Sequence, residues 1–285
     1  MIWKLLWIML KRERGTQVAV VIFLLFAVGG IGSLSTHEKS IYHPLTGSDP
    51  DIIGFSQPSV KHLLGTDYVG RDIFSQILAG SCNALVNGFW TGVFIAVPVF
   101  IFAFIKVGRG YEPYLDHSPL YLFIFLPFCA IQIWFALALP IISMTSVGSI
   151  SFVFYLILVL PFLWLVTWKS FGHLLVNSIE EKREKIPFLR LLFETVPIFF
   201  LIIFFMMSWT NILNGQLTFF GLGNPNSVTW GMMLLWCFTT GATFSYPFWL
   251  LTPGLCSWLF SAVTIYIAWR GYDTLLLVSP LVIMT

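Results

Sequence analysis

Residues 16–34 read TQVAVVIFLLFAVGGIGSL and contain no charged side chain. A helix needs about 20 apolar residues to cross the hydrocarbon core of a bilayer, so this stretch predicts a transmembrane helix. The whole chain is built in the same way, since 58% of its 285 residues are hydrophobic and only 10% are charged. A soluble domain carries roughly 25% charged residues. We therefore expect an all-α integral membrane protein whose main solvent is lipid.

Five further apolar stretches are long enough to span a bilayer, namely residues 85–105, 120–142, 150–168, 191–211 and 248–269. The sequence thus predicts six transmembrane helices. We divide the chain into a cytoplasmic or interfacial segment (1–15), a first span (16–34), a loop (35–81), a core with spans two to six (82–270) and an apolar tail (271–285).

Two shorter apolar stretches do not reach the length of a span. Residues 1–10 are interrupted by a lysine, and we interpret them as a helix lying in the membrane interface. Residues 231–244 predict either a helix packed at the outer surface or a re-entrant segment.

The basic residues are distributed unevenly between the two sides of the predicted membrane domain. If six spans alternate, twelve of the 15 Lys and Arg fall on one side, and only Lys39, Lys61 and Arg71 fall on the other. Cytoplasmic loops carry an excess of Lys and Arg. This distribution predicts that both termini are cytoplasmic and that the loop at 35–81 is external.

Several kinds of chemistry find no support in the sequence. No ionisable residue falls clearly in the middle of a predicted span, which disfavours an ion-coupled carrier. The chain has no GxxxxGK[ST] motif, so any ATPase would be another polypeptide. The four cysteines form no CxxC pair and the five histidines no HxxxH pair. We predict no metal site, no cofactor and no catalytic residues.

The external loop contains the most distinctive stretch, HLLGTDYVGRDIFSQILAG at residues 62–80. Gly65 and Gly70 allow a tight bend, and Thr66 and Asp67 can cap a following turn. Arg71 and the adjacent Asp72 can form ion pairs within the loop or, in the case of arginine, donate to carbonyls. From the residues alone this is a folded external loop rather than a catalytic site.

This stretch resembles the GTDxxGRD segment that precedes the second span in peptide/nickel-type ABC importer permeases. The matching residues, all in register, are Gly65, Thr66, Asp67, Gly70, Arg71 and Asp72. A second match to that family is LTFFGLG at 217–223 followed by TWGMML at 229–234, and it includes Gly221, Leu222, Gly223, Trp230 and Gly231. A third is WLLTPGL at 249–255, so the resemblance covers roughly residue 35 to the end.

The resemblance implies a permease subunit with a type I ABC importer-like fold in the plasma membrane of a prokaryote. It implies four kinds of partner: a second permease subunit, two cytoplasmic ATPase subunits, an extracytoplasmic solute-binding protein and the lipid bilayer. The transported solutes of the family are peptides or metal chelates. No nucleic-acid partner is expected.

The chain departs from the family in the loop at 169–190, which lacks the usual EAA-like run and its downstream glycine. We expect a reduced ATPase-docking helix there, with candidate residues Glu180, Glu181, Arg183, Lys185 and Arg190. The alternative is a solvated helix end that only follows the positive-inside rule. A second hypothesis for the whole chain is therefore a non-transporting structural membrane subunit derived from such a permease.

A smaller pattern lies in the second predicted span, where Gly88 and Gly92 are four residues apart. Small residues at this spacing allow two helix backbones to approach closely. The pattern would allow a close helix contact at this site, and spacings of this kind also arise often by chance.

Overall fold

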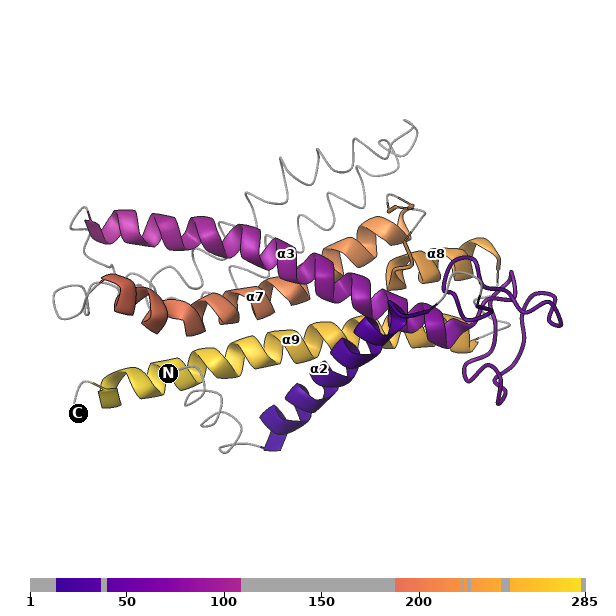
Figure 1. Cartoon of the computed structure of the whole chain (residues 1–285), viewed down its shortest axis with the longest axis horizontal. Helices are drawn as coiled ribbons and strands as arrows, with labels where there is room; N and C mark the ends of the chain where they lie inside the picture. The colour runs from indigo at the N-terminus through magenta and orange to yellow at the C-terminus, as the bar shows by residue number, and fades with distance from the viewer. Residues whose placement is uncertain are drawn as a thin grey trace. The chain divides into compact units, whose positions relative to one another are not determined.

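The computed structural model describes residues 14–36, 40–108, 188–221, 223–224, 227–241 and 247–282. Within these ranges the regular structure is helical: α2 (Arg14–Ser33), α3 (Ile73–Gly108), α7 (Phe188–Phe219), α8 (Trp230–Thr239) and α9 (Pro247–Val282) (Figure 1). No strand occurs in the described ranges, where the extended pairing is limited to isolated bridges of Thr66 with Ser56 and with Asp72.

Four helices are long and apolar enough to cross a membrane: Arg14–Ser33, Ile73–Ile105, Thr195–Phe219 and Leu251–Tyr272. They coincide with four of the six predicted spans and support a multi-pass membrane protein. The predicted spans at 120–142 and 150–168, and the interfacial segment at 1–10, lie outside the described residues. Six spans and cytoplasmic termini therefore stay predictions.

The helices extend beyond the predicted spans. α3 begins at Ile73, twelve residues before the predicted span. The prediction began later because polar residues such as Ser75, Gln76 and Asn83 lower the hydropathy of the first turns without breaking the helix. α9 continues to Val282, so residues 271–282 prolong the last helix.

The chain divides into two compact units, and each is described by itself. The first, which we call the loop unit, comprises Gly15–Phe89 and Met207–Ile267. Its core is aromatic: the ring of Phe260 lies 5.6 Å from that of Phe26 and 5.8 Å from that of Trp230. The other unit includes the described residues 90–108, 188–206 and 268–282.

Glycines bring α3 and α7 into close contact. In the loop unit, a Cβ on Gly88 would come within 3.0 Å of the Cα of Met207. In the other unit, a Cβ on Gly92 would come within 3.0 Å of the Cα of Ile203. Two backbones can approach this closely only where a side chain is missing. The close contact that the spacing of Gly88 and Gly92 allows is present at both glycines.

Uncharged polar side chains join α7 to α9 within the loop unit. Nδ2 of Asn211 donates to the carbonyl of Ser257 at 3.0 Å and to Oγ of Ser261 at 2.8 Å. Oγ of Ser208 donates to the carbonyl of Ser261 at 2.9 Å. In lipid such hydrogen bonds contribute modestly to helix pairing, and they fix which faces meet.

Candidate functional site

Among the described residues, polar side-chain contacts are concentrated in the loop between α2 and α3, and Asp67 is at the centre of one cluster. The carboxylate is fully buried. Its Oδ1 accepts hydrogen bonds from the backbone N–H groups of Val69 and Arg71, each at 2.9 Å. Its Oδ2 accepts from Nε of Arg71 at 2.7 Å and from Nε2 of Gln76 at 2.8 Å. Four donors, one of them cationic, stabilise a charge that would otherwise be costly to bury.

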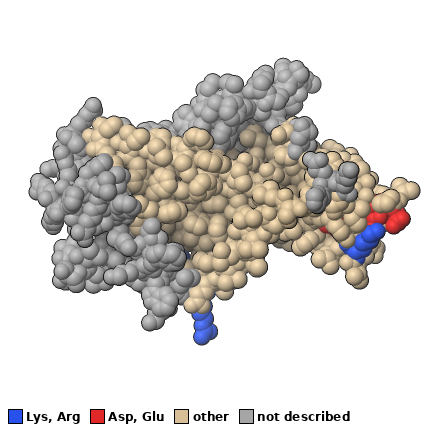
Figure 2. All heavy atoms as spheres, in the orientation of Figure 1, with Lys and Arg blue, Asp and Glu red and all other residues tan. Residues whose placement is uncertain are grey.

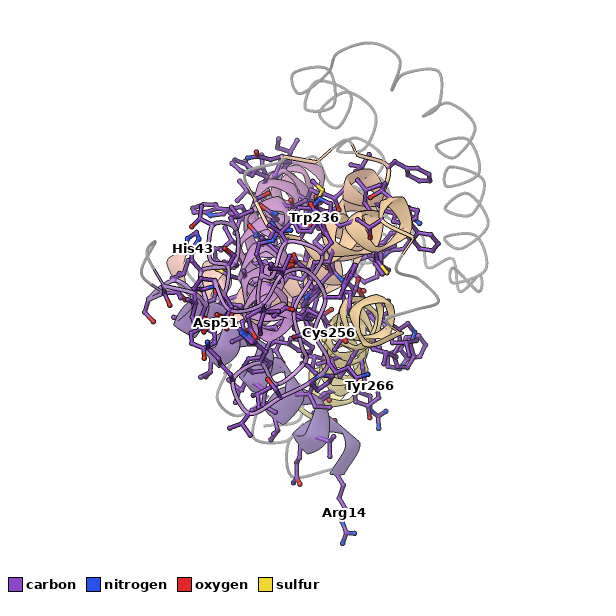
Figure 3. All side chains as sticks on the ribbon, turned by 90° about the vertical axis from the view of Figure 1, so that its right-hand side faces the viewer. Arg14, His43, Asp51, Trp236, Cys256 and Tyr266 are labelled. Atoms are coloured by element: carbon purple, nitrogen blue, oxygen red, sulfur yellow. The ribbon has the colours of Figure 1, made fainter. Side chains whose placement is uncertain are left out.

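Arg71 connects this loop to α8. Its side chain is only 9% exposed, and its guanidinium carbon lies 4.4 Å from the ring centroid of Trp236 on α8 and 5.6 Å from that of Tyr68. Trp236 is labelled in Figure 3. A guanidinium over an aromatic face is attracted by the ring quadrupole. Arg71 therefore joins two segments that both carry a motif resemblance.

A second charged cluster forms around His62, which is also fully buried. Nδ1 of His62 lies 2.9 Å from Oδ1 of Asp72, and Nε2 lies 3.1 Å from Oδ2 of Asp49. The same Asp49 oxygen is 2.6 Å from Nζ of Lys61. On the face drawn in Figure 2, the visible acidic side chains of the described residues gather at this loop.

Asp72 also begins α3. Its Oδ2 accepts hydrogen bonds from the backbone N–H and from Oγ of Ser75, both at 2.7 Å. This is the geometry of a helix N-cap, which satisfies a donor that the first turn would leave free. One carboxylate oxygen of Asp72 therefore caps the start of α3, and the other contacts the ring of His62.

Electrostatics of the second cluster favour its charged state. Lys61, followed by the backbone N–H of Asp51 and by His62, lowers the pKa of Asp49 from 3.8 to about 2. The contribution of Asp49 to stability is therefore complete above about pH 4 and is lost as the pH falls through about 2. The same pair raises the pKa of Lys61, whose contribution is lost only as the pH rises through that raised value.

Two glycines of the GTDYVGRD segment have backbone conformations that other residues rarely adopt. Gly65 has a φ of +80° and Gly70 a φ of +86°. A Cβ on Gly65 would collide with the carbonyl oxygen of Ser56, and one on Gly70 would lie 2.8 Å from the carbonyl oxygen of Ile52. The predicted tight bends at both positions are confirmed, and each is packed against another part of the loop.

Thr66 and Asp67 were both expected to cap a turn, but only Asp67 does so. Oδ1 of Asp67 closes the turn at 67–71, as predicted. The hydroxyl of Thr66 instead donates to the carbonyl of Gly54 at 2.8 Å, which pins the loop to itself. The ion pair of Arg71 is made with Asp67, and Asp72 turns to His62.

The second motif forms the beginning of α8. Thr229 caps the helix by accepting from the backbone N–H of Met232. Nε1 of the buried Trp230 donates to the carbonyl of Ile77 on α3 at 3.2 Å. Gly231 packs against the backbone of Gly215 on α7, where a Cβ would collide with the carbonyl oxygen. α8 thus packs on the polar loop and on the ends of α3 and α7.

The remaining motif residues, in the turn after α7, make fewer contacts with the loop and α8. Gly221 has a φ of +78° in the turn that follows α7, and a Cβ on Gly223 would lie 2.5 Å from Thr218. Leu222 lies outside the described residues.

The candidate ATPase-docking residues are mostly beyond the described part of the chain. Glu180, Glu181, Arg183 and Lys185 lie outside it, and Arg190 falls in the first turn of α7. Among the residues that the structure describes, no group of three or more His, Cys, Asp or Glu is placed to hold a metal ion.

Sequence reasoning missed the partners that complete the two clusters: Asp49, Lys61, His62, Gln76 and Trp236. Asp49 and His62 are 13 residues apart, and Trp236 lies on a helix far along the chain. No local pattern marks such pairs. The one available signal was the presence of several charged residues in a chain that otherwise has few.

One curated protein is partly similar to this chain. The protein described as "Probable D,D-dipeptide transport system permease protein DdpC" of Escherichia coli (strain K12) is 37% identical over 91 residues. The match covers 30% of this chain and 26% of that protein. No family model matches the chain. The similarity supports a relationship to permeases for part of the chain, and the chain matches about a quarter of its relative's length.

Proposed function

We propose that this chain is the permease subunit of a heteromeric ATP-binding-cassette importer in the plasma membrane of a prokaryote. One observation carries the proposal: the GTDYVGRD segment at 65–72 folds around the buried Asp67–Arg71 pair and is joined through Arg71 to α8. Both segments match permease motifs, and a stretch of the chain is 37% identical to a permease. A shared fold alone would not imply function, so the support comes from these particular residues.

The proposed cargo is a peptide of about dipeptide size or a related small solute, metal chelates included. The name of the similar protein specifies D,D-dipeptides, which makes them the first solutes to test. The chain itself would perform no catalysis. Its proposed partners are a second permease, two ATPases, which would supply the energy, and a solute-binding protein outside the membrane.

A second candidate function rests on the loop at 169–190, which lacks the EAA-like run through which related permeases engage their ATPases. In that case the chain would be a structural subunit without transport coupling. The two candidate functions predict different consequences when the chain is deleted. A transport subunit is required for uptake, whereas a structural subunit is required only for assembly.

Uptake by intact cells tests the proposal. Cells lacking the chain should fail to accumulate labelled D-alanyl-D-alanine or L-alanyl-L-alanine, and expression of the chain should restore uptake. An ATPase partner inactivated in its own nucleotide site should abolish uptake while leaving the complex assembled. Unchanged uptake of both dipeptides in the deletion strain, together with loss of the complex, would favour the structural subunit.

The docking role of the 169–190 loop is tested separately by replacing Glu181, Arg183 and Lys185 together with alanine. We expect loss of ATPase co-purification and of uptake, because the opposite charges at i,i+4 spacing that support a helix are removed. If ATPase binding and uptake are both unchanged, the docking site lies elsewhere.

A further inference from the structure

We propose that α8 lies at the edge of the bilayer's hydrocarbon, in the leaflet on the same side as the 40–72 loop, and that a phenylalanine patch at its end contacts lipid acyl chains. The phenylalanine patch consists of Phe219 and Phe220 at the end of α7 and Phe238 in the last turn of α8. The proposal requires only that the chain is a membrane protein and does not depend on the transport function.

The phenylalanine patch is exposed where α7 ends. The ring centroid of Phe219 lies 5.6 Å from that of Phe220 and 5.4 Å from that of Phe238. The side chain of Phe220 is 41% exposed and that of Phe238 is 52% exposed. Phe219 is the last residue of a helix that is long and apolar enough to cross a membrane. The patch therefore borders a membrane-spanning part of the chain.

The opposite side of α8 faces the polar loop. Trp236 lies two positions before Phe238, which places the two side chains about 200° apart around a helix. The guanidinium carbon of Arg71 lies 4.4 Å from the ring centroid of Trp236, and Figure 1 shows α8 beside the loop. α8 thus has a charged group over one side and an exposed phenylalanine on the other, as expected for a helix between water and hydrocarbon.

The sequence around α8 contains no charged side chain. Residues 195–269 include no Asp, Glu, Lys, Arg or His, although the connections on both sides of α8 fall within them. If residues 216–246 lay in water, they would carry roughly eight charged residues. The loop on the same side of the protein carries Asp49, Asp51, Lys61, Asp67, Arg71 and Asp72. This contrast indicates that the surroundings of α8 are less polar than those of the loop.

The carbonyl groups at the end of α8 accept hydrogen bonds from neighbouring hydroxyl groups. Oγ1 of Thr239 donates to the carbonyl of Leu235 at 3.0 Å, and Oγ1 of Thr240 donates to the carbonyl of Trp236 at 2.7 Å. A helix end in water can leave its last carbonyls to the solvent. Hydrocarbon offers no hydrogen bonds, so the chain itself must supply the donors there. The end of α8 is therefore suited to surroundings with little water.

The same kind of bond occurs where α2 ends. Oγ of Ser33 donates to the carbonyl of Gly30, and Oγ of Ser35 donates to the carbonyl of Gly32, each at 2.7 Å. α2 is long and apolar enough to cross a membrane, so its end marks a boundary of the bilayer. The shared arrangement supports a position of α8 at such a boundary.

Spin labelling tests the proposal in the assembled protein. In a cysteine-free background, Phe238→Cys carries a nitroxide, and the chain is purified in mild detergent with any subunits that stay bound and reconstituted into phospholipid bilayers. Collisions of the nitroxide with oxygen report hydrocarbon, and collisions with a polar nickel chelate report water. Leu25→Cys, at a position of α2 that is 68% exposed, is the control for lipid. Ile53→Cys, at a loop position that is 99% exposed, is the control for water.

We expect the ratio of oxygen to nickel collisions at Phe238→Cys to exceed that at Ile53→Cys by at least about threefold, because a polar chelate is disfavoured in hydrocarbon. A smaller ratio with frequent nickel collisions would show that the patch faces water. Infrequent collisions with both reagents would show that a protein surface covers it. Either result would overturn the proposal, and Phe220→Cys provides the same measurement if Phe238→Cys does not fold.

Discussion

The loop at 40–72 and the contacts among α3, α7 and α9 are held together by different means. In the loop, two buried clusters, centred on Asp67 and His62, contain the ion pairs Arg71–Asp67 and Lys61–Asp49. In the helices, the corresponding contacts are glycine backbones at Gly88 and Gly92 and the uncharged amide of Asn211. The same chain therefore uses ionised groups in one region and small or neutral groups in the other.

The solvent explains the difference. In water a loop of this size has little apolar surface to bury, and a carboxylate surrounded by donors can be removed from water without being left unsatisfied. In lipid there is no hydrophobic gain from bringing two apolar helices together, so close packing and neutral hydrogen bonds remain. A charge between the helices would also be expensive in that medium.

The largest effect is expected when the charge balance of the loop is broken. Asp67→Asn preserves the shape of the side chain and leaves the guanidinium of Arg71 buried without its counter-ion, which should destabilise the folded loop by about 3–5 kcal/mol. Hydrogen–deuterium exchange of 60–76 in detergent measures this as increased local opening.

Asp51→Asn is the matched control, because Asp51 is an aspartate of the same loop with an 83% exposed side chain. It should leave exchange close to that of the wild type. Similar opening in the two variants would show that buried charge does not hold the loop.

The next effect comes from the backbone of the loop. Gly65→Ala combines a φ of +80° with a collision against the carbonyl oxygen of Ser56, and it should destabilise the loop by about 3 kcal/mol. Gly54 has the same φ, but a Cβ there would meet no atom closer than 3.7 Å. Gly54→Ala should therefore cost about 1 kcal/mol. Hydrogen–deuterium exchange of the loop amides compares the two variants. Equal destabilisation by Gly65→Ala and Gly54→Ala would mean that the contact with Ser56 is unimportant.

A smaller effect is expected where the helices touch. Gly88→Leu forces a side chain against the backbone of Met207 and should destabilise the folded protein by about 1–3 kcal/mol. Gly32→Leu in α2 is the control, since nothing lies within 4 Å of a Cβ there. Thermal unfolding in detergent should separate the two, and an unchanged unfolding temperature for Gly88→Leu would contradict the close contact of α3 and α7.

The smallest effect should come from the hydrogen bonds in lipid. Asn211→Ala removes the donor to Ser257 and Ser261 and should destabilise the protein by about 0.5–1.5 kcal/mol. Asn214→Ala is its control, because that side chain makes no hydrogen bond within the described residues. A loss for Asn211→Ala as large as that for Asp67→Asn would remove the proposed difference between the two regions.

The spans could be predicted because their signal is local. A run such as 16–34 is apolar along its whole length, and the segment that follows Asp72 was missed as helix only because Ser75, Gln76 and Asn83 interrupt its apolar pattern. The spacing of Gly88 and Gly92 also marked a site where helices can pack closely, because two small residues one turn apart lie on one helix face.

The clusters of the loop could be predicted only in part. The turn at Asp67 follows from residues within four positions, and it was anticipated. The pairing of His62 with Asp49 and Asp72 depends on where the loop returns in space, which Gly65 and Thr66 decide through contacts with Ser56 and Gly54. The charged residues of the loop indicate that each needs a partner of opposite charge. Which residues pair is determined by the fold of the loop.

The predicted topology places the loop in water outside the membrane and the 169–190 segment inside the cell. In a cysteine-free background, Ile53→Cys places a thiol at a loop position that is 99% exposed, and Arg183→Cys places one in the predicted cytoplasmic loop. A membrane-impermeant maleimide added to intact cells should label Ile53→Cys and should label Arg183→Cys only after permeabilisation. Labelling of both variants from the same side of an intact membrane would contradict the topology and the importer proposal that rests on it.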